Sequence, residues 1–136
     1  MPAWVEFHDS TLESASLGFD GVTLLFDAYV HRWERIDGRW VGTGWSQPVS
    51  ISIGGPAVGR DMVGPVEVDE GCLTIDESTD GGLVPLPLLR RGQVTLRVGL
   101  CTGERLEFAG RGVRVESQGE ATFVEELPED MRPSSG

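Results

Sequence analysis

The segment His8-Asp9-Ser10 contains the three side-chain types of a hydrolase catalytic triad. A working triad needs the three groups in line in space, whereas consecutive residues of a strand point to opposite faces. The chain also lacks a Gly-x-Ser-x-Gly sequence, the turn that presents a nucleophilic serine in α/β-hydrolases. We therefore interpret Asp9 or Ser10 as a turn or cap after a first strand, and predict no catalytic residue.

The only two histidines, His8 and His31, lie among carboxylates and are the candidate metal ligands. Two histidines and a carboxylate would suit zinc or non-haem iron, and strand alternation places Asp27, Tyr29 and His31 on one face. Nothing in the spacing brings His8 near His31, so solvated surface histidines are the preferred interpretation. We predict neither a metal nor any other cofactor.

An aromatic cluster surrounds the dipeptide Asp37-Gly38. The candidate binding residues there are Tyr29, His31, Trp33, Trp40 and Trp45. Aromatic and arginine side chains dominate the binding free energy of many protein interfaces, and Arg32, Arg35 and Arg39 are interleaved with this cluster. The alternative is that cross-strand aromatic pairs under arginine side chains stabilise a long hairpin. The cluster is the best candidate binding surface in the sequence.

Three further motifs predict no chemistry. Residues 54–59 are glycine-rich but lack the Gly-Lys-Ser/Thr of a phosphate loop, so they are interpreted as a plain loop. The acidic run in residues 67–80 lacks the order of a calcium loop and is interpreted as a solvated edge. Cys72 and Cys101 match no metal or redox spacing, and we expect two buried free thiols.

The charge balance limits the partners. Twenty-two acidic residues against eleven basic ones, all arginine, give a formal charge of −11. A field of this sign repels phosphate backbones and anionic lipid, so nucleic acid and membranes are not expected partners. It suits a basic protein, whose association rate should fall as salt rises. Because the sequence shows neither a signal peptide nor an apolar run of membrane length, we expect a cytoplasmic location.

Alternating strands are the elements that must position these residues. Residues 22–30 and 93–100 alternate apolar and polar side chains, so each predicts a central strand with one buried face. Asp37-Gly38 predicts a hairpin tip, and residues 101–104 predict a turn that leads to a partner strand at 105–109. Shorter strands are expected at 49–53, 66–68, 72–75, 112–116 and 121–125.

The distribution of glycine and proline completes the fold prediction. Nineteen glycines and eight prolines leave room for at most one short helix, at residues 83–89, where two prolines favour an extended connection equally well. The sequence therefore predicts an all-β fold, either an antiparallel sandwich or a partly open barrel. We expect one domain over residues 1–127 and a flexible C-terminal tail over 128–136.

Several segments together resemble a known group of proteins. They are Phe7-His8-Asp9-Ser10, Ala28-Tyr29-Val30-His31, residues 112–117 and residues 119–126. This pattern is similar to a group of bacterial all-β proteins without an established activity, and some similar short all-β proteins are predicted immunity proteins of bacterial toxin systems. The resemblance implies the all-β fold and leaves the role open.

Two functions are consistent with these observations. The first is a non-enzymatic interaction protein of the immunity kind, which holds a basic protein partner with the aromatic hairpin. The alternative is a small-molecule-binding barrel or enzyme with an internal pocket lined by tryptophan, Tyr29 and His31. No nucleophile and base stand at a recognisable spacing, so the sequence favours the interaction protein.

Overall fold

The computed structural model describes residues 2–132, and these residues form nine strands and one short 3-10 turn, η1. The elements are β1 (Ala3–Gly18), β2 (Gly21–Ile36), β3 (Arg39–Val58), β4 (Met62–Ile75), β5 (Ser78–Asp80), β6 (Leu83–Pro85), β7 (Leu88–Leu100), β8 (Arg105–Ser117), β9 (Thr122–Leu127) and η1 (Glu129–Met131). All-β is therefore confirmed as the fold class. No helix among the described residues is long and apolar enough to cross a membrane.

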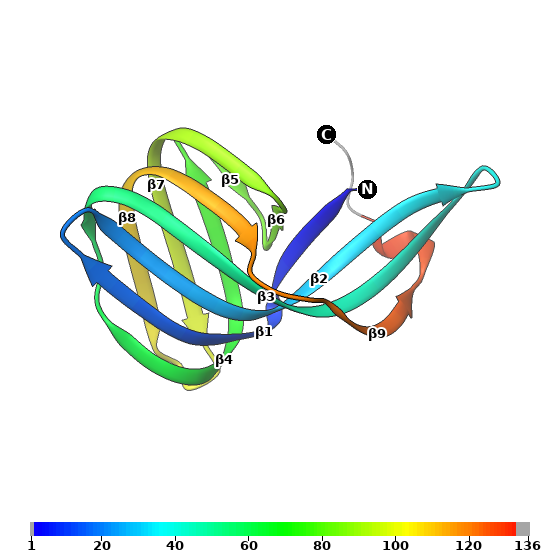
Figure 1. Cartoon of the computed structure of the whole chain (residues 1–136), viewed down its shortest axis with the longest axis horizontal. Coiled ribbons are helices and arrows are strands. Elements are labelled where there is room, and N and C mark those ends of the chain that lie inside the picture. The colour runs from blue at the N-terminus through cyan, green and yellow to red at the C-terminus, as the bar shows by residue number, and fades with distance from the viewer. Residues whose placement is uncertain (1, 133–136) are drawn as a thin grey trace.

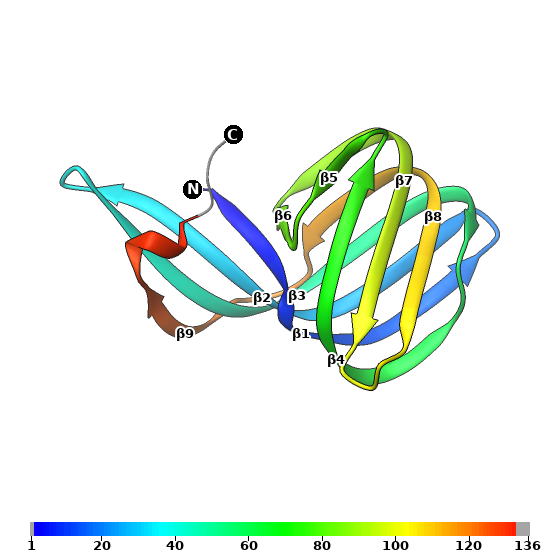
Figure 2. The same cartoon turned by 180° about the vertical axis from the view of Figure 1, so that it is seen from behind.

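Six strands close into a ring, which we call the barrel. The order is β1-β2-β3-β8-β7-β4, and β4 pairs again with β1 to complete the ring, with every pair antiparallel. Because β4 follows β3 in the chain but lies beside β1, the first four strands have a Greek-key arrangement. Figure 2 shows β4, β7 and β8 side by side across the barrel.

The inward side chains of these strands form one hydrophobic core. In β2 the residues at alternate positions from 22 to 30 are at most 2% exposed, and in β7 those from 94 to 100 are at most 3% exposed. These inward residues are Val22, Leu24, Phe26, Ala28, Val30, Val94, Leu96, Val98 and Leu100. The two central strands predicted from the period-two pattern are thus confirmed.

Beyond the barrel, β2 and β3 continue as a projecting sheet that we call the arm (Figure 1). It consists of residues 29–36 of β2, residues 39–46 of β3, the start of β1 and the whole of β9. Its tip is the Asp37-Gly38 turn, where φ is 52° at Asp37 and 77° at Gly38, as the hairpin prediction requires. The turn after β7, with Gly103 at φ 93°, is confirmed as well.

Some predicted boundaries are wrong. The strands expected at 66–68 and 72–75 are one strand, β4, with a register shift between Val68 and Glu70. Those expected at 105–109 and 112–116 are likewise one strand, β8. A β-bulge inserts an extra residue without ending a strand, so the glycines and polar residues at these positions do not end β4 and β8. The short helix considered at 83–89 does not form, because β6 and the start of β7 occupy it.

The C-terminal segment starts within the described residues. Residues 129–131 form η1, and the guanidinium group of Arg132 lies 4.4 Å from the centre of the Trp40 ring. Residues 133–136 lie outside the described residues, so the flexible tail predicted for 128–136 stays a prediction.

Candidate functional site

The arm has two faces because successive strand residues point to opposite sides. Its outer face continues the outside of the barrel and carries Tyr29, His31 and Trp33, which share it by alternation along β2. Its inner face continues the inward side of the barrel strands and carries Arg32 and Trp45. The five predicted binding residues are therefore divided between two surfaces.

Two aromatic rings on the outer face lie across glycines of the neighbouring strand β3. A Cβ added to Gly42 would lie 2.3 Å from Cζ3 of Trp33, and one added to Gly44 would lie 2.1 Å from the hydroxyl oxygen of Tyr29. The rings thus occupy the space that side chains at these positions would need. This explains why β3 carries two glycines in the arm, where glycine otherwise weakens a strand.

On the outer face of β2, His31 lies between Tyr29 and Trp33. Its Nε2 donates a hydrogen bond to Oε2 of Glu6 at 2.8 Å, and its ring meets the Tyr29 ring edge to face at 5.3 Å between centres. His31 is 2% exposed and Trp33 is 1% exposed. Both residues therefore support the arm from within, and direct contact with a partner would have to come from other side chains.

Tyr29 connects β2 to β9 across β3. Its hydroxyl donates to Oε2 of Glu125 at 2.6 Å. Burial and this hydrogen bond to a carboxylate raise the pKa of Tyr29 above its ordinary value, because both disfavour the phenolate. The contact ties β9 to the rest of the arm.

Trp40 lies near the tip on the outer face, beneath two arginines. The guanidinium carbon of Arg35 is 5.8 Å from its ring centre, and that of Arg132 is 4.4 Å away. Both are within the range of a cation–π contact. The expectation that arginines cover the aromatic rings of the hairpin is met here.

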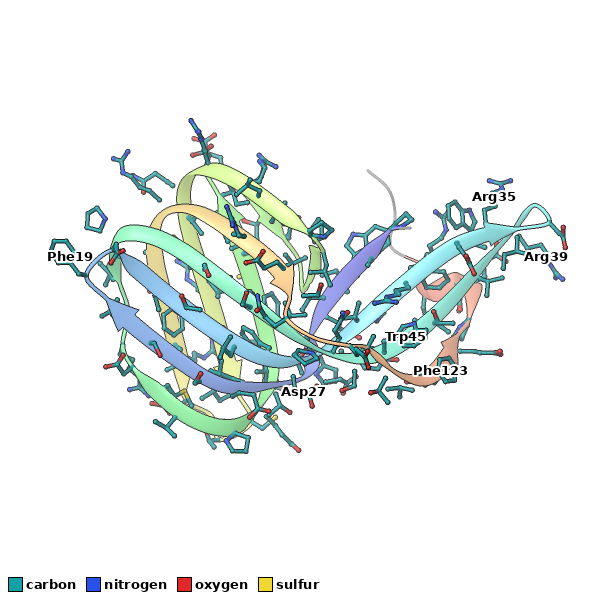
Figure 3. The ribbon with its side chains drawn as sticks, in the orientation of Figure 1. Phe19, Asp27, Arg35, Arg39, Trp45 and Phe123 are labelled. Atoms are coloured by element: carbon teal, nitrogen blue, oxygen red, sulfur yellow. The ribbon has the colours of Figure 1, made fainter. Side chains whose placement is uncertain are left out.

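The inner face holds a compact group that we call the Trp45 cluster: Arg32, Trp45 and Phe123. The guanidinium carbon of Arg32 is 5.0 Å from the Trp45 ring centre, and the Phe123 ring meets Trp45 edge to face at 5.4 Å. Phe123 is 52% exposed, and Figure 3 shows it beside Trp45 on the arm. Sequence reasoning missed Phe123 because its contact with Trp45 depends on the pairing of β9 with β3.

Hydrogen bonds fix the Trp45 cluster in place. Nε1 of Trp45 donates to Oγ1 of Thr43 at 2.8 Å, and Nη2 of Arg32 donates to Oε1 of Gln47 at 3.2 Å. Arg32 and Gln47 also border a hollow of about 200 Å³ where the arm meets the barrel, with Ala3, Leu86, Pro87 and Ser117 as the other lining residues. The cluster is thus a preorganised, half-exposed surface beside a small depression.

His8-Asp9-Ser10 forms a bulge in β1. Asp9 has φ 75°, and the register of β1 against β2 shifts between Glu6 and Thr11. The hydroxyl of Ser10 donates to the carbonyl oxygen of Glu6 at 2.5 Å and accepts from the backbone N–H of Tyr29 at 2.9 Å. The structural interpretation of this motif holds, but β1 continues through it instead of ending, since a bulge keeps the ladder going.

The two histidines occupy different environments: the prediction of a solvated surface histidine holds for His8 and is wrong for His31, which is 2% exposed. Nδ1 of the exposed His8 donates to the carbonyl oxygen of Asp69 at 2.8 Å, whereas His31 bonds to Glu6. The bond to Asp69 and the nearby Asp9 carboxylate raise the pKa of His8. Residues 2–132 contain no group of three or more potential metal ligands. The absence of a cofactor stays a prediction.

The remaining motifs have ordinary structural places. Residues 54–58 are the end of β3 and not a loop as expected, and the acidic run follows β4 and β5. Both cysteines are free thiols, but Cys72 is half-buried and Cys101 is exposed, so the expectation that both are buried is wrong. Cys101 lies in the turn after β7, where no core surrounds it.

Comparisons of this chain with protein-family models, with curated proteins and with solved structures give no match. The resemblance to bacterial immunity proteins therefore stays a prediction.

Proposed function

We propose that this chain is a non-enzymatic protein-binding module and that the inner face of the arm is its binding surface. The observation that carries the proposal is the half-exposed Trp45 cluster on a sheet that projects from an already filled barrel. Tryptophan and arginine are enriched at the energetic centres of protein interfaces. A projecting sheet also leaves this cluster accessible to a large partner.

The rigidity of the cluster supports the same proposal. Binding costs free energy when side chains must be ordered, by about 0.5–1.5 kcal/mol for each rotamer-rich side chain. Here Thr43 already holds Trp45, and Gln47 already holds Arg32. Tyr29, His31, Trp33 and Trp40 contribute by stiffening the outer face of the same sheet, so the predicted aromatic residues act together through the arm.

The partner we propose is a basic protein. The chain has a formal charge of −11, and carboxylates gather on and beside β9, next to the Trp45 cluster. They are Glu120, Glu125, Glu126, Glu129 and Asp130. Opposite charge speeds association and selects against acidic partners. The resemblance to immunity proteins would make a basic toxin such a partner, and free thiols fit a bacterial cytoplasm.

The alternative function, an internal pocket for a small molecule or substrate, gains no support from the packing. The core side chains of β2, β3, β7 and β8 are aliphatic or aromatic, and the most exposed of them, Leu106, is only 4% exposed. A barrel of eight strands is just wide enough to be filled by side chains, so a six-stranded barrel leaves less room still. A ligand would need a surface hollow instead.

Parallel capture experiments from source-cell lysate test the proposal. Immobilised wild-type chain is compared with Phe123→Ala and with Phe19→Ala as the matched control. Phe19 is fully exposed, and Figure 3 shows it at the end of the barrel that faces away from the arm. Circular dichroism melting first establishes that all three chains fold.

We expect one basic protein that is retained by wild type and Phe19→Ala, lost by Phe123→Ala, and released as salt increases. A loss of affinity of at least tenfold on Phe123→Ala corresponds to about 1.4 kcal/mol of binding free energy. Only a minority of interface residues contribute more than about 1 kcal/mol when truncated to alanine. Equal retention by all three chains would show that the arm is not the binding surface.

A further inference from the structure

β9 has one edge without a partner strand. It pairs with β3 along residues 42–46, and no described strand pairs with its other side. Residues 122–126 are all exposed. β5 and β6 also have free edges but contain three residues each, whereas β9 contains six. The free edge of a strand of this length presents backbone N–H and C=O groups with which another strand can form hydrogen bonds.

The charge on β9 selects what can pair with it. Glu125 and Glu126 are adjacent, and an antiparallel pair of two β9 strands centred there would bring carboxylates opposite carboxylates. Like charges directly across a strand pair are destabilising, whereas opposite charges stabilise the pair. A second copy of this chain is therefore a poor occupant, and a strand that carries cationic side chains is a good one.

β9 also carries exposed apolar side chains, which could contact apolar residues of an added strand. Phe123 is 52% exposed and Val124 is 49% exposed. Val124 is the extra residue at the register shift between Gly44 and Trp45, so it has no partner on β3. The hydrogen bond from Tyr29 to Glu125 keeps this short strand in place before anything binds.

We propose that β9 takes up an extended, arginine- or lysine-rich segment of the protein partner as an additional strand of the arm. Main-chain hydrogen bonds to the free edge supply affinity, while Glu126 favours cationic side chains and Phe123 and Val124 favour apolar side chains on the added strand. This inference rests on the proposed function and adds the mode by which the arm recognises its partner.

A nuclear magnetic resonance titration of the full chain with three model peptides tests strand addition. The first is a blocked hexapeptide, Arg-Val-Arg-Thr-Arg-Val. The second has glutamate in place of each arginine. The third is the cationic peptide with every backbone nitrogen methylated, so that its charge is kept while its main chain can donate no hydrogen bond.

We expect the first peptide to shift the amide signals of residues 122–127 most strongly and the other two to leave them unchanged. Equal binding of the methylated peptide, with shifts centred on Arg32 and Trp45, would overturn strand addition and leave the proposed function standing. No shift anywhere on the arm would also overturn it, and the lysate experiment would then decide the proposed function independently.

Two charge variants provide a second readout. Glu126→Gln removes an exposed carboxylate from β9, and Glu77→Gln removes one from the turn between β4 and β5. We expect the first change to weaken binding of the cationic hexapeptide by about two- to fivefold and the second to leave it unchanged. Equal weakening by both would indicate a general charge effect and contradict a contact at β9.

Discussion

The hydroxyl of Ser10 serves two backbone groups at once at the bulge of β1, since it donates to the Glu6 carbonyl and accepts from the Tyr29 N–H. Ser10 is 1% exposed, so water cannot replace the hydroxyl. We expect Ser10→Ala to lower the free energy of unfolding by about 1–3 kcal/mol. Urea denaturation measures this, with the exposed Ser16→Ala as control; equal stability of both variants would contradict the structural role of the motif.

Tyr29 is the only tyrosine in the chain, so its ionisation can be followed alone by ultraviolet absorbance. We expect it to titrate above the ordinary value of about 10, and Glu125→Gln to lower its pKa. Because the folded phenol holds its proton more tightly than the unfolded one, its contribution to stability is complete below pH of about 10 and is lost as the pH rises through the folded pKa. An ordinary pKa in wild type would contradict the contact with Glu125.

At the scale of the elements, the arm depends on glycines of β3 that leave room for aromatic rings of β2 to lie over them. A side chain at Gly42 would collide with the Trp33 ring, whereas one at Gly81 would meet nothing within 4 Å. We expect Gly42→Ala to destabilise the protein by about 1–3 kcal/mol. Gly81→Ala, measured by the same thermal melt, should change stability by less than about 1 kcal/mol. Similar losses for both would mean that Trp33 does not pack on Gly42.

The elements also show how far the sequence can be interpreted by itself. Period-two alternation and the Asp37-Gly38 turn depend on neighbouring residues, and for this reason both predictions hold. The closure of β4 on β1 and the pairing of β9 with β3 join residues far apart in the chain, so no local pattern reveals them. Trp45 was therefore predicted, while its neighbour Phe123 was not.

The burial of Trp33 had no local signal either. Alternation extends the face of Asp27, Tyr29 and His31 to Trp33, but the outer face of a barrel strand is normally solvated. Here Gly42 leaves room for the ring to lie flat against β3, and Trp33 is 1% exposed. A glycine opposite a tryptophan in a hairpin was the available hint, since Trp33 pairs with Gly42 in the Asp37-Gly38 register.

The whole molecule combines a filled barrel with an arm that is packed less extensively. Local opening costs least where few apolar side chains are buried. We expect amide hydrogens near the tip, at residues 35–40, to exchange through local opening, and those of Leu96 and Phe108 only through global unfolding. Hydrogen exchange across a urea series measures both. Equal protection of tip and barrel would contradict this division.

The continuity of β2 and β3 has a mechanical consequence. These strands have 16 and 20 residues, against about five or six in an ordinary strand, and each runs without a break from the barrel into the arm. Their pairing keeps one register from the barrel to the tip, so we expect the arm and the barrel to move as one body. We expect a force applied at the Asp37-Gly38 tip to be transmitted along both strands into the barrel. There, the hydrogen bonds of β2 to β1 and of β3 to β8 would have to break together before the barrel unfolds.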